Sequence, residues 1–231
     1  MQKNMAVTDS FGKIFDKYPL EITTDEWHVN ESNPKASFKR LIIRNTGKEF
    51  HAFNNMVYKN LGCITTDKSS FLENKDCDGV AFTEKDGKMC LVLSELKSSL
   101  DSCDILKAYR QIVFTYLKLH MMMSVCEGFD ISNWEIIGII ACLPPKNEDQ
   151  KTKLQLELLN MEEGNNEIKP DIKCFVQLFF KKKIESGLAD TPFTKGKPLH
   201  EKLKDMKISI CLKTANSTTD SETELNLNSL T

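Results

Sequence analysis

The stretch "CDGVAFTEKDGKMCLVLSELKSS", residues 77–99, constrains the fold of this chain more than any other. Two apolar runs flank Asp86-Gly87, and this pair favours a two-residue type I′ hairpin turn because both turn positions need positive φ. If these residues form the turn, Lys85 pairs with Lys88, and the numbers of paired positions sum to 173 all along the ladder. The stretch therefore predicts an antiparallel hairpin with a defined register.

Three charged side chains lie at the far end of this hairpin. In the predicted register Asp78 lies opposite Glu95, and because side chains alternate between faces, Lys97 shares the face of Glu95. Cβ atoms of directly opposed residues are about 5 Å apart. The other residues of that face are apolar: Val80, Phe82, Leu91 and Leu93. We therefore expect two carboxylates and one ammonium to converge at the end of a hydrophobic face.

Such a trio has the chemistry of a metal-dependent hydrolase. Two close carboxylates repel each other, which raises one pKa unless a cation lies between them. Mg²⁺ is typically held by one or two protein carboxylates and several waters. The lysine can then orient or deprotonate the attacking water, or stabilise charge that develops on a phosphate. The alternative is a strand cap at Asp78 and a solvated strand end at Glu95 and Lys97; the register and the flanking apolar runs favour a site.

The remaining apolar patterns predict the other elements. Before the hairpin we expect a helix within residues 35–62, from the spacing of Phe50, Phe53, Met56, Val57 and Leu61, and then a short strand at 63–66. After it we expect a long helix from Asp101 or Ser102, a buried strand at 134–145, an amphipathic helix at 147–166, and strands at 172–180 and 207–213.

This order implies an α/β fold with a mixed central sheet flanked by helices, because a hairpin is antiparallel and a strand–helix–strand unit is parallel. Residues 1–34 are polar and are expected to form an N-terminal arm with one short helix at most. Residues 35–213 are expected to form a single domain. The polar tail, residues 214–231, is expected to be disordered.

Composition bounds the class of protein. The chain has 231 residues, of which 40% are apolar, so it can bury a sizeable core without disulfides. Its net charge of -2 does not advertise a nucleic-acid binder. The eight cysteines lack zinc-knuckle spacing and are expected to act as small core hydrophobes. Without a signal-peptide pattern or an apolar run of membrane-spanning length, a cytoplasmic location is expected.

With "CDGVAF" followed by "LVLSELKSS", the chain resembles the PD-(D/E)XK nuclease superfamily, which includes restriction-type and RecB-like nucleases. Asp78, Glu95 and Lys97 stand in the positions of the family's Asp, Glu and Lys. Residues 35–143 match the family's core order of helix, three-strand meander, helix and strand (αβββαβ), so the resemblance covers under half of the chain. Cys77 replaces the motif's proline, at a position that varies in the family.

Two further positions extend the resemblance in part. Gln111, on the long helix, resembles the glutamine of the RecB-like Q-x-x-x-Y motif, but Tyr116 comes one position too late for that spacing. The family also carries a glutamate on its first helix. In "GKEFHAF" His51 occupies that place and Glu49 lies two residues earlier, so either Glu49 is a further metal ligand or the site lacks one. On a helix these two options exclude each other.

The resemblance implies an endonuclease that hydrolyses phosphodiester bonds in DNA with Mg²⁺, for which Mn²⁺ would substitute. RNA as the substrate stays open, as do strandedness and the biological setting (restriction, phage defence or repair). A homodimer would supply the two active sites that cutting both strands of a duplex commonly needs.

Lysines are concentrated in the C-terminal part of the chain. Between residues 169 and 213 there are eleven lysines, no arginine and five acidic residues, a local balance of +6 in a chain of net charge -2. Lysines favour phosphate contacts over bidentate base reading. Lys181, Lys182 and Lys183 are the densest cluster and the candidate nucleic-acid contacts; a solvated lysine-rich surface is the alternative.

Two other functions remain open on the sequence alone. The first is a non-catalytic nucleic-acid-binding or interaction protein on the same fold, because the first-helix glutamate and the glutamine motif are incomplete. The second is a cysteine hydrolase, which eight cysteines and four histidines would permit but no local motif supports.

Overall fold

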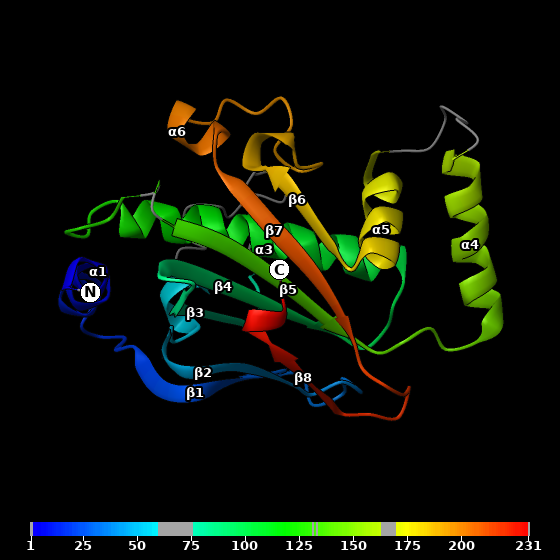
Figure 1. The fold of residues 1–231 in the computed structure, drawn as a ribbon, viewed down its shortest axis with the longest axis horizontal. Coiled ribbons are helices and arrows are strands. Elements are labelled where there is room, and N and C mark those ends of the chain that lie inside the picture. The colour runs from blue at the N-terminus through cyan, green and yellow to red at the C-terminus, as the bar shows by residue number, and fades with distance from the viewer. Residues whose placement is uncertain (1, 60–75, 131, 133, 163–169, 231) are drawn as a thin grey trace.

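A computed structural model describes residues 2–59, 76–130, 132, 134–162 and 170–230. Its centre is a mixed, open, eight-stranded sheet in the order β1-β2-β3-β4-β5-β7-β6, with β8 paired to β2 outside this path (Figure 1). Strands β4, β5 and β7 run parallel to one another. The strands are β1 (Glu21–Asn30), β2 (Arg40–Ala52), β3 (Gly79–Lys85), β4 (Lys88–Lys97), β5 (Trp134–Cys142), β6 (Lys183–Gly187), β7 (Lys207–Thr214) and β8 (Glu222–Asn226).

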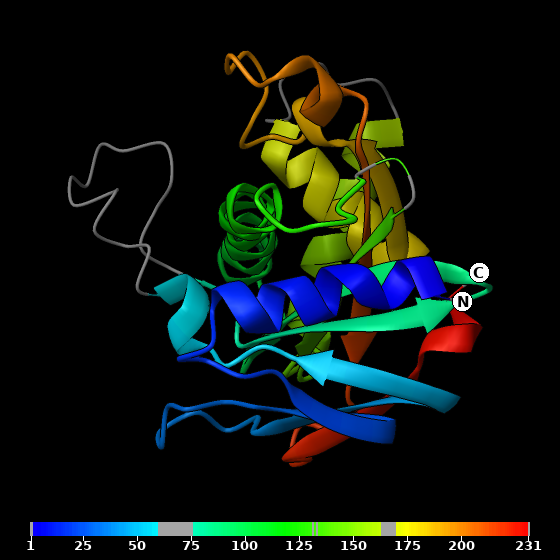
Figure 2. The same cartoon turned by 90° about the vertical axis from the view of Figure 1, so that its left-hand side faces the viewer.

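The two faces of the central strands are covered by different layers. Helices α3 and α5 lie on one face, whereas β1, β2 and β8 lie on the opposite side (Figures 1 and 2). Each face has its own hydrophobic core. The described helices are α1 (Gln2–Ile14), α2 (Met56–Lys59), α3 (Ser102–Met123), α4 (Glu148–Glu162), α5 (Pro170–Lys181) and α6 (Glu201–Lys204), with the 3₁₀ turns η3 (Leu188–Asp190) and η4 (Leu227–Ser229). None of them is long and apolar enough to cross a membrane.

The predicted hairpin is confirmed. Asp86 and Gly87 have φ angles of 52° and 76°, as a type I′ turn requires. Lys85 pairs with Lys88, and the ladder continues in the predicted register to Gly79 opposite Ser94. The helix expected from Asp101 is confirmed as α3, and the Asp101 side chain caps it by accepting a hydrogen bond from the Asp104 N–H at 2.8 Å. Strands β5 and β7 and helix α4 were also predicted.

The helix expected within residues 35–62 is wrong. Residues 40–52 form strand β2, and the helix α2 that follows has four described residues. In β2, Leu41, Ile43 and Asn45 are almost completely buried, whereas Arg40 and Arg44 are exposed, as the two-residue period of a strand requires. Ile42 is also buried, with 9% exposed. The helical spacing that starts at Phe50 instead runs across the end of the strand into α2. The strand expected at 63–66 lies outside the described residues.

The strand expected at residues 172–180 is also wrong, because this segment forms helix α5. A short apolar run does not distinguish a buried strand from a buried helix by periodicity alone. In α5, Phe175, Val176 and Leu178 are buried in the core shared with α3. Proline at the first position is compatible with the start of a helix.

Both ends of the chain are more structured than expected. The N-terminal arm contains α1 and β1, and α1 packs Val7 and Phe11 into the core beneath the helices. The tail contains β8, which pairs in parallel with β2 from Arg40 to Arg44 and buries Leu225 and Leu227. The tail is therefore ordered by pairing with a distant strand, which its own composition does not reveal.

Candidate active site

The structure brings Asp78, Glu95 and Lys97 together at the end of the hairpin. Asp78 directly precedes β3, and its Oδ2 accepts a hydrogen bond of 2.8 Å from the backbone N–H of Leu96. Lys97 Nζ forms an ion pair with Glu95 Oε1. The Glu95 side chain is 3% exposed and that of Lys97 is 12% exposed, so the pair is largely withdrawn from water.

Burial controls the protonation of Glu95. Its apolar neighbours on β3 and β4 are fully buried against the helices: Val80, Phe82, Leu91 and Leu93. Desolvation raises the pKa of Glu95 to about 8, and the negative charges of Asp78 and, to a smaller extent, Glu31 act in the same direction. The Lys97 ammonium acts in the opposite direction without cancelling the effect. Even beside Lys97, the Glu95 carboxyl is therefore mostly protonated at pH 7 until a further cation binds to it.

One oxygen of this carboxyl group has no partner. Glu95 Oε2 is buried and forms no hydrogen bond with the described residues. A buried carboxyl oxygen that is left unpaired costs free energy, about 1–3 kcal/mol for a polar group and more when it is charged. The position and chemistry of this oxygen fit a ligand atom for a cation.

Gln111 of α3 links Lys97 to the loop that carries Asp78. Its Oε1 accepts a hydrogen bond from Lys97 Nζ at 3.1 Å, and its Nε2 donates to the Asp76 carbonyl at 2.9 Å. Tyr116 points away from this site, because it follows Gln111 by five residues, which is a rotation of about 140° around the helix axis. Its hydroxyl lies 3.4 Å from His120 Nδ1. The glutamine of the predicted motif thus lies at the site, and the tyrosine does not.

Two further residues of α3 hold the same loop, and the sequence analysis missed them. Thr115 Oγ1 accepts a hydrogen bond from the Cys77 N–H at 3.0 Å. Lys118 Nζ forms a buried ion pair with Asp76 Oδ1 at 2.7 Å. With Gln111, these residues form a polar stripe at spacings of four and three on an otherwise apolar part of the helix, a pattern that was visible in the sequence.

The loop is also held from the side of α2. Asn55 Nδ2 donates to the Asp78 carbonyl at 2.9 Å, and the Tyr58 hydroxyl donates to Asn55 Oδ1 at 2.5 Å. Burial raises the pKa of Tyr58 well above its usual value, so its hydroxyl remains a donor at neutral pH. The backbone beside Asp78 is therefore fastened by both α2 and α3.

Glu49 and His51 lie away from this site. Both belong to β2, where residues two apart share a face, and the carboxylate of Glu49 lies 3.3 Å from His51 Nε2. His51 pairs with Phe82, which places Glu49 beside Glu84 and about 20 Å along the strand from Asp78. The sequence analysis treated Glu49 and His51 as alternatives because it expected a helix here, but these residues form a strand. Glu31, beyond the end of β1, is the further carboxylate whose charge reaches Glu95.

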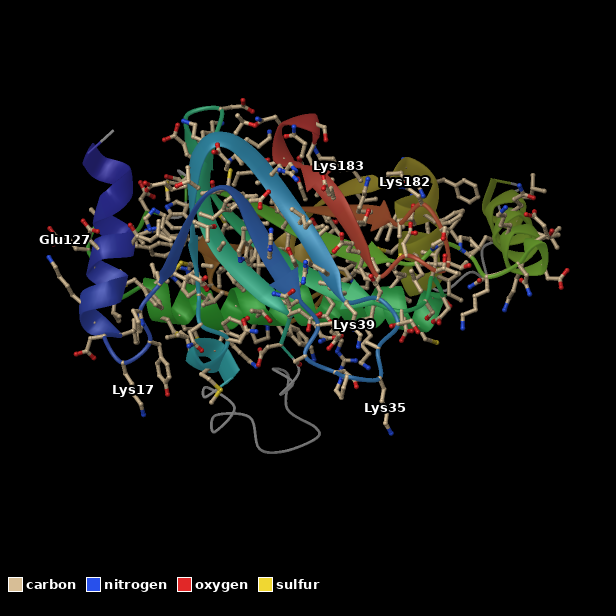
Figure 3. All side chains as sticks on the ribbon, turned by 90° about the horizontal axis from the view of Figure 1, so that it is seen from below. Lys17, Lys35, Lys39, Glu127, Lys182 and Lys183 are labelled. Carbon is tan, nitrogen blue, oxygen red and sulfur yellow. The ribbon has the colours of Figure 1, made fainter. Side chains whose placement is uncertain are left out.

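Lys181, Lys182 and Lys183 lie on another part of the sheet. The Lys182 carbonyl accepts a hydrogen bond from the Leu212 N–H at 2.7 Å, and Leu212 aligns through Ile140 with Glu95. Three strand spacings, about 14 Å, therefore separate the backbones of Lys182 and Glu95. Figure 3 shows Lys182 beside α5 and Lys183 beside the C-terminal segment. Within the described residues no hydrogen bond or ion pair joins these lysines to the site.

The carboxylates of the candidate site are oxygen ligands, which suit Mg²⁺ or Mn²⁺. Across the described ranges, no three His, Cys, Asp or Glu side chains are grouped closely enough to hold a metal ion. Asp78 and Glu95 supply the two carboxylates with which Mg²⁺ or Mn²⁺ is commonly held, with waters filling the other positions. These two residues are the candidate metal ligands.

Comparisons with known proteins do not assign the chain to a family. No family model matches the chain, and no curated protein or solved structure is significantly similar to it.

Proposed function

We propose that the chain is a metal-dependent nuclease of the PD-(D/E)XK type that hydrolyses phosphodiester bonds in DNA. The observation that carries the proposal is the buried, unpartnered Oε2 of Glu95, beside a second carboxylate at Asp78 and an ammonium at Lys97. A site that was merely structural would have no reason to bury a carboxyl group with one oxygen unpaired. A divalent cation held by Glu95 and Asp78 would account for that oxygen.

The order of elements supports this proposal. Helix α1, strands β2, β3 and β4, helix α3 and strand β5 follow one another in the order that the resemblance implies, with β1 inserted after α1 and α2 inserted between β2 and β3. In this alignment α1 takes the place of the first helix, which the sequence pattern had located within residues 35–62. The mixed α/β architecture is therefore compatible with a restriction-endonuclease-like fold.

Each side chain has a role that follows from its contacts. Bound Mg²⁺ would lower the pKa of water and act as a Lewis acid toward the phosphate. Asp78 and Glu95 would hold it. Lys97, which contacts Glu95 Oε1, would supply an ammonium beside the cation for the attacking water or for a phosphate oxygen. Gln111 keeps Lys97 at that position through its 3.1 Å contact.

Cleavage of plasmid DNA tests the proposal. Purified protein should cut DNA with Mg²⁺ or Mn²⁺ and lose this activity with EDTA, and Glu95→Gln and Lys97→Ala should each abolish cutting. Lys88→Ala is the matched control, because Lys88 is an exposed lysine at the opposite end of the same strand. Circular dichroism should show that all three variants are folded. If Glu95→Gln and Lys97→Ala cut as well as the wild type, the site assignment is wrong.

A non-catalytic nucleic-acid-binding protein is the second candidate. The observation that favours it is the position of Glu49, which leaves two carboxylates at the site without the further acidic ligand that the resemblance implies. Titration calorimetry with Mn²⁺ separates the two candidates. Binding that is lost in Asp78→Asn supports the nuclease, whereas DNA binding without any metal binding supports the second candidate.

A further inference from the structure

A lysine-lined pocket lies away from the candidate active site, and it carries an inference of its own. Its volume is about 530 Å³, within the range of small-molecule sites. It lies between the junction of α5 and β6, the end of β7 and the C-terminal β8–η4 segment. Four lysines line it, and none of its described lining residues is acidic: Lys181, Lys182, Lys183 and Lys213.

The backbone of Lys182 is held in an unusual conformation at this pocket. Its φ is 60°, a left-handed conformation that glycine adopts easily and that costs other residues about 1–2 kcal/mol. Its N–H donates to the Leu178 carbonyl at 2.9 Å, which ends α5, and its carbonyl accepts from Leu212 at 2.7 Å. Glycine would adopt this conformation with less strain, so the presence of lysine indicates a role for its side chain.

Among the described residues, none of the four ammonium groups forms an ion pair with an acidic side chain. Lys204 and Lys207, from the same lysine-rich segment, form ion pairs with Glu201 and Glu185. By contrast, Lys182 Nζ lies 4.7 Å from the centre of the Phe179 ring, and Lys183 Nζ lies 3.4 Å from the Leu230 carbonyl.

Two further observations bear on the charge of the pocket. Arg44 binds the carboxylate of Glu224 at 3.1 and 3.2 Å and is the main cause that lowers its pKa. The charge of Lys213 lowers this pKa to a smaller extent. Burial lowers the pKa of Lys182, as expected for a partly desolvated cation. An anion would relieve the mutual repulsion of the lysines.

The pocket also offers an apolar floor. Leu225 is buried, and Leu230 packs against the same core. The backbone of a nucleic-acid strand is contacted by cations spaced along a track. Here the cations gather around one concavity that has leucines beneath it. Lysines bind phosphates as point charges, without the planar fork of arginine. The combination suits a compact ligand that carries phosphate at one end and an apolar ring at the other.

We propose that this pocket binds a phosphorylated ligand of nucleotide size, with its phosphates on Lys182, Lys183 and Lys213 and its ring on the leucine floor. The proposal does not depend on nuclease activity, because Glu95 and Lys97 take no part in this pocket.

Titration calorimetry of the full chain with ATP, ADP, AMP and pyrophosphate, without divalent cations, tests the proposal. Wild-type protein should bind at least one of the three nucleotides more tightly than pyrophosphate, because pyrophosphate cannot use the apolar floor. The double variant Lys182→Gln/Lys183→Gln should weaken that binding at least tenfold. Lys195→Gln/Lys202→Gln removes the same charge from exposed positions of the same segment and should leave the binding unchanged.

A single substitution guards against a folding artefact. Lys182→Gly removes the ammonium and relieves the left-handed conformation, so it should raise the thermal midpoint while weakening nucleotide binding. Three results would each overturn the proposal: no nucleotide binding at millimolar concentration, equal weakening in both double variants, or binding of DNA or RNA at these lysines that nucleotides do not displace.

Discussion

Lys118 Nζ lies 2.7 Å from Asp76 Oδ1, and the two side chains are 1% and 2% exposed. This buried ion pair lies two residues before Asp78 and on the same stripe of α3 as Gln111 and Thr115. Desolvation offsets much of the attraction in such a pair, so its net contribution to stability is small while both partners are present. Its position indicates that it holds the 76–78 loop in place.

Removing one partner of this pair should be costly. Lys118→Met removes the ammonium that faces the buried Asp76 carboxylate, and we expect a loss of about 3–5 kcal/mol in the free energy of unfolding. Urea denaturation measures this loss. The double variant Lys118→Met/Asp76→Leu should recover most of it, and Lys107→Met, at an exposed position of the same helix, should change stability by less than about 0.5 kcal/mol. A small effect of Lys118→Met would contradict the buried pairing.

Stability should depend on pH through Glu95. Its pKa is about 8 in the folded protein and about 4.5 when unfolded, so the folded state binds a proton more tightly. The contribution of the Glu95 proton to the free energy of unfolding is fully present below pH 4.5. It is lost as the pH rises toward 8, by up to about 1.4 kcal/mol per pH unit. Urea denaturation without divalent cations should show a shallower fall of stability between pH 5 and pH 8 for Glu95→Gln than for wild type. Glu49→Gln, at an exposed position of β2, should follow the wild type.

Cation binding should release a proton. Because Glu95 is mostly protonated at pH 7, Mn²⁺ must displace a proton when it binds to this carboxyl group. Calorimetry in two buffers of different ionisation enthalpy should reveal the release, and the affinity should rise as the pH approaches 8. Glu95→Gln and Asp78→Asn should abolish binding. Binding that is independent of pH would place the cation elsewhere.

Gln111 should act through Lys97. Gln111→Ala removes the contacts to Lys97 Nζ and to the Asp76 carbonyl, and we expect cutting to fall by about 10- to 100-fold. Gln177→Ala on α5 is a control in which the cutting rate should stay the same. If Gln111→Ala cuts DNA as fast as the wild type, Gln111 has no role at the site.

The tail should contribute to stability. Leu227 is fully buried under the sheet, so Leu227→Ala should cost about 2–5 kcal/mol in the free energy of unfolding. Leu156→Ala, at an exposed position of α4, should cost far less. Thermal or urea denaturation checks both variants. Equal and small effects would mean that β8 is not docked on β2 in solution.

Local sequence determined the parts of the molecule whose geometry depends on near neighbours. The Asp86-Gly87 turn set the register of β3 and β4, because few residue pairs adopt positive φ at two successive positions. That register and strand alternation were enough to bring Asp78, Glu95 and Lys97 together. The N-cap at Asp101 and the buried strand β5 were predictable for the same local reasons.

Tertiary structure decided what depends on distant partners. Residues 40–52 became a strand because β1, β3 and β8 supply its hydrogen bonds, and residues 170–181 became a helix because α3 offers a matching apolar surface. The strand conformation of β2 removed Glu49 and His51 from the site, and packing of α3 over the 76–78 loop added Asp76, Thr115 and Lys118. Hydrophobic burial is not directional, so a short apolar run takes the conformation that its neighbours in space can pair with or cover.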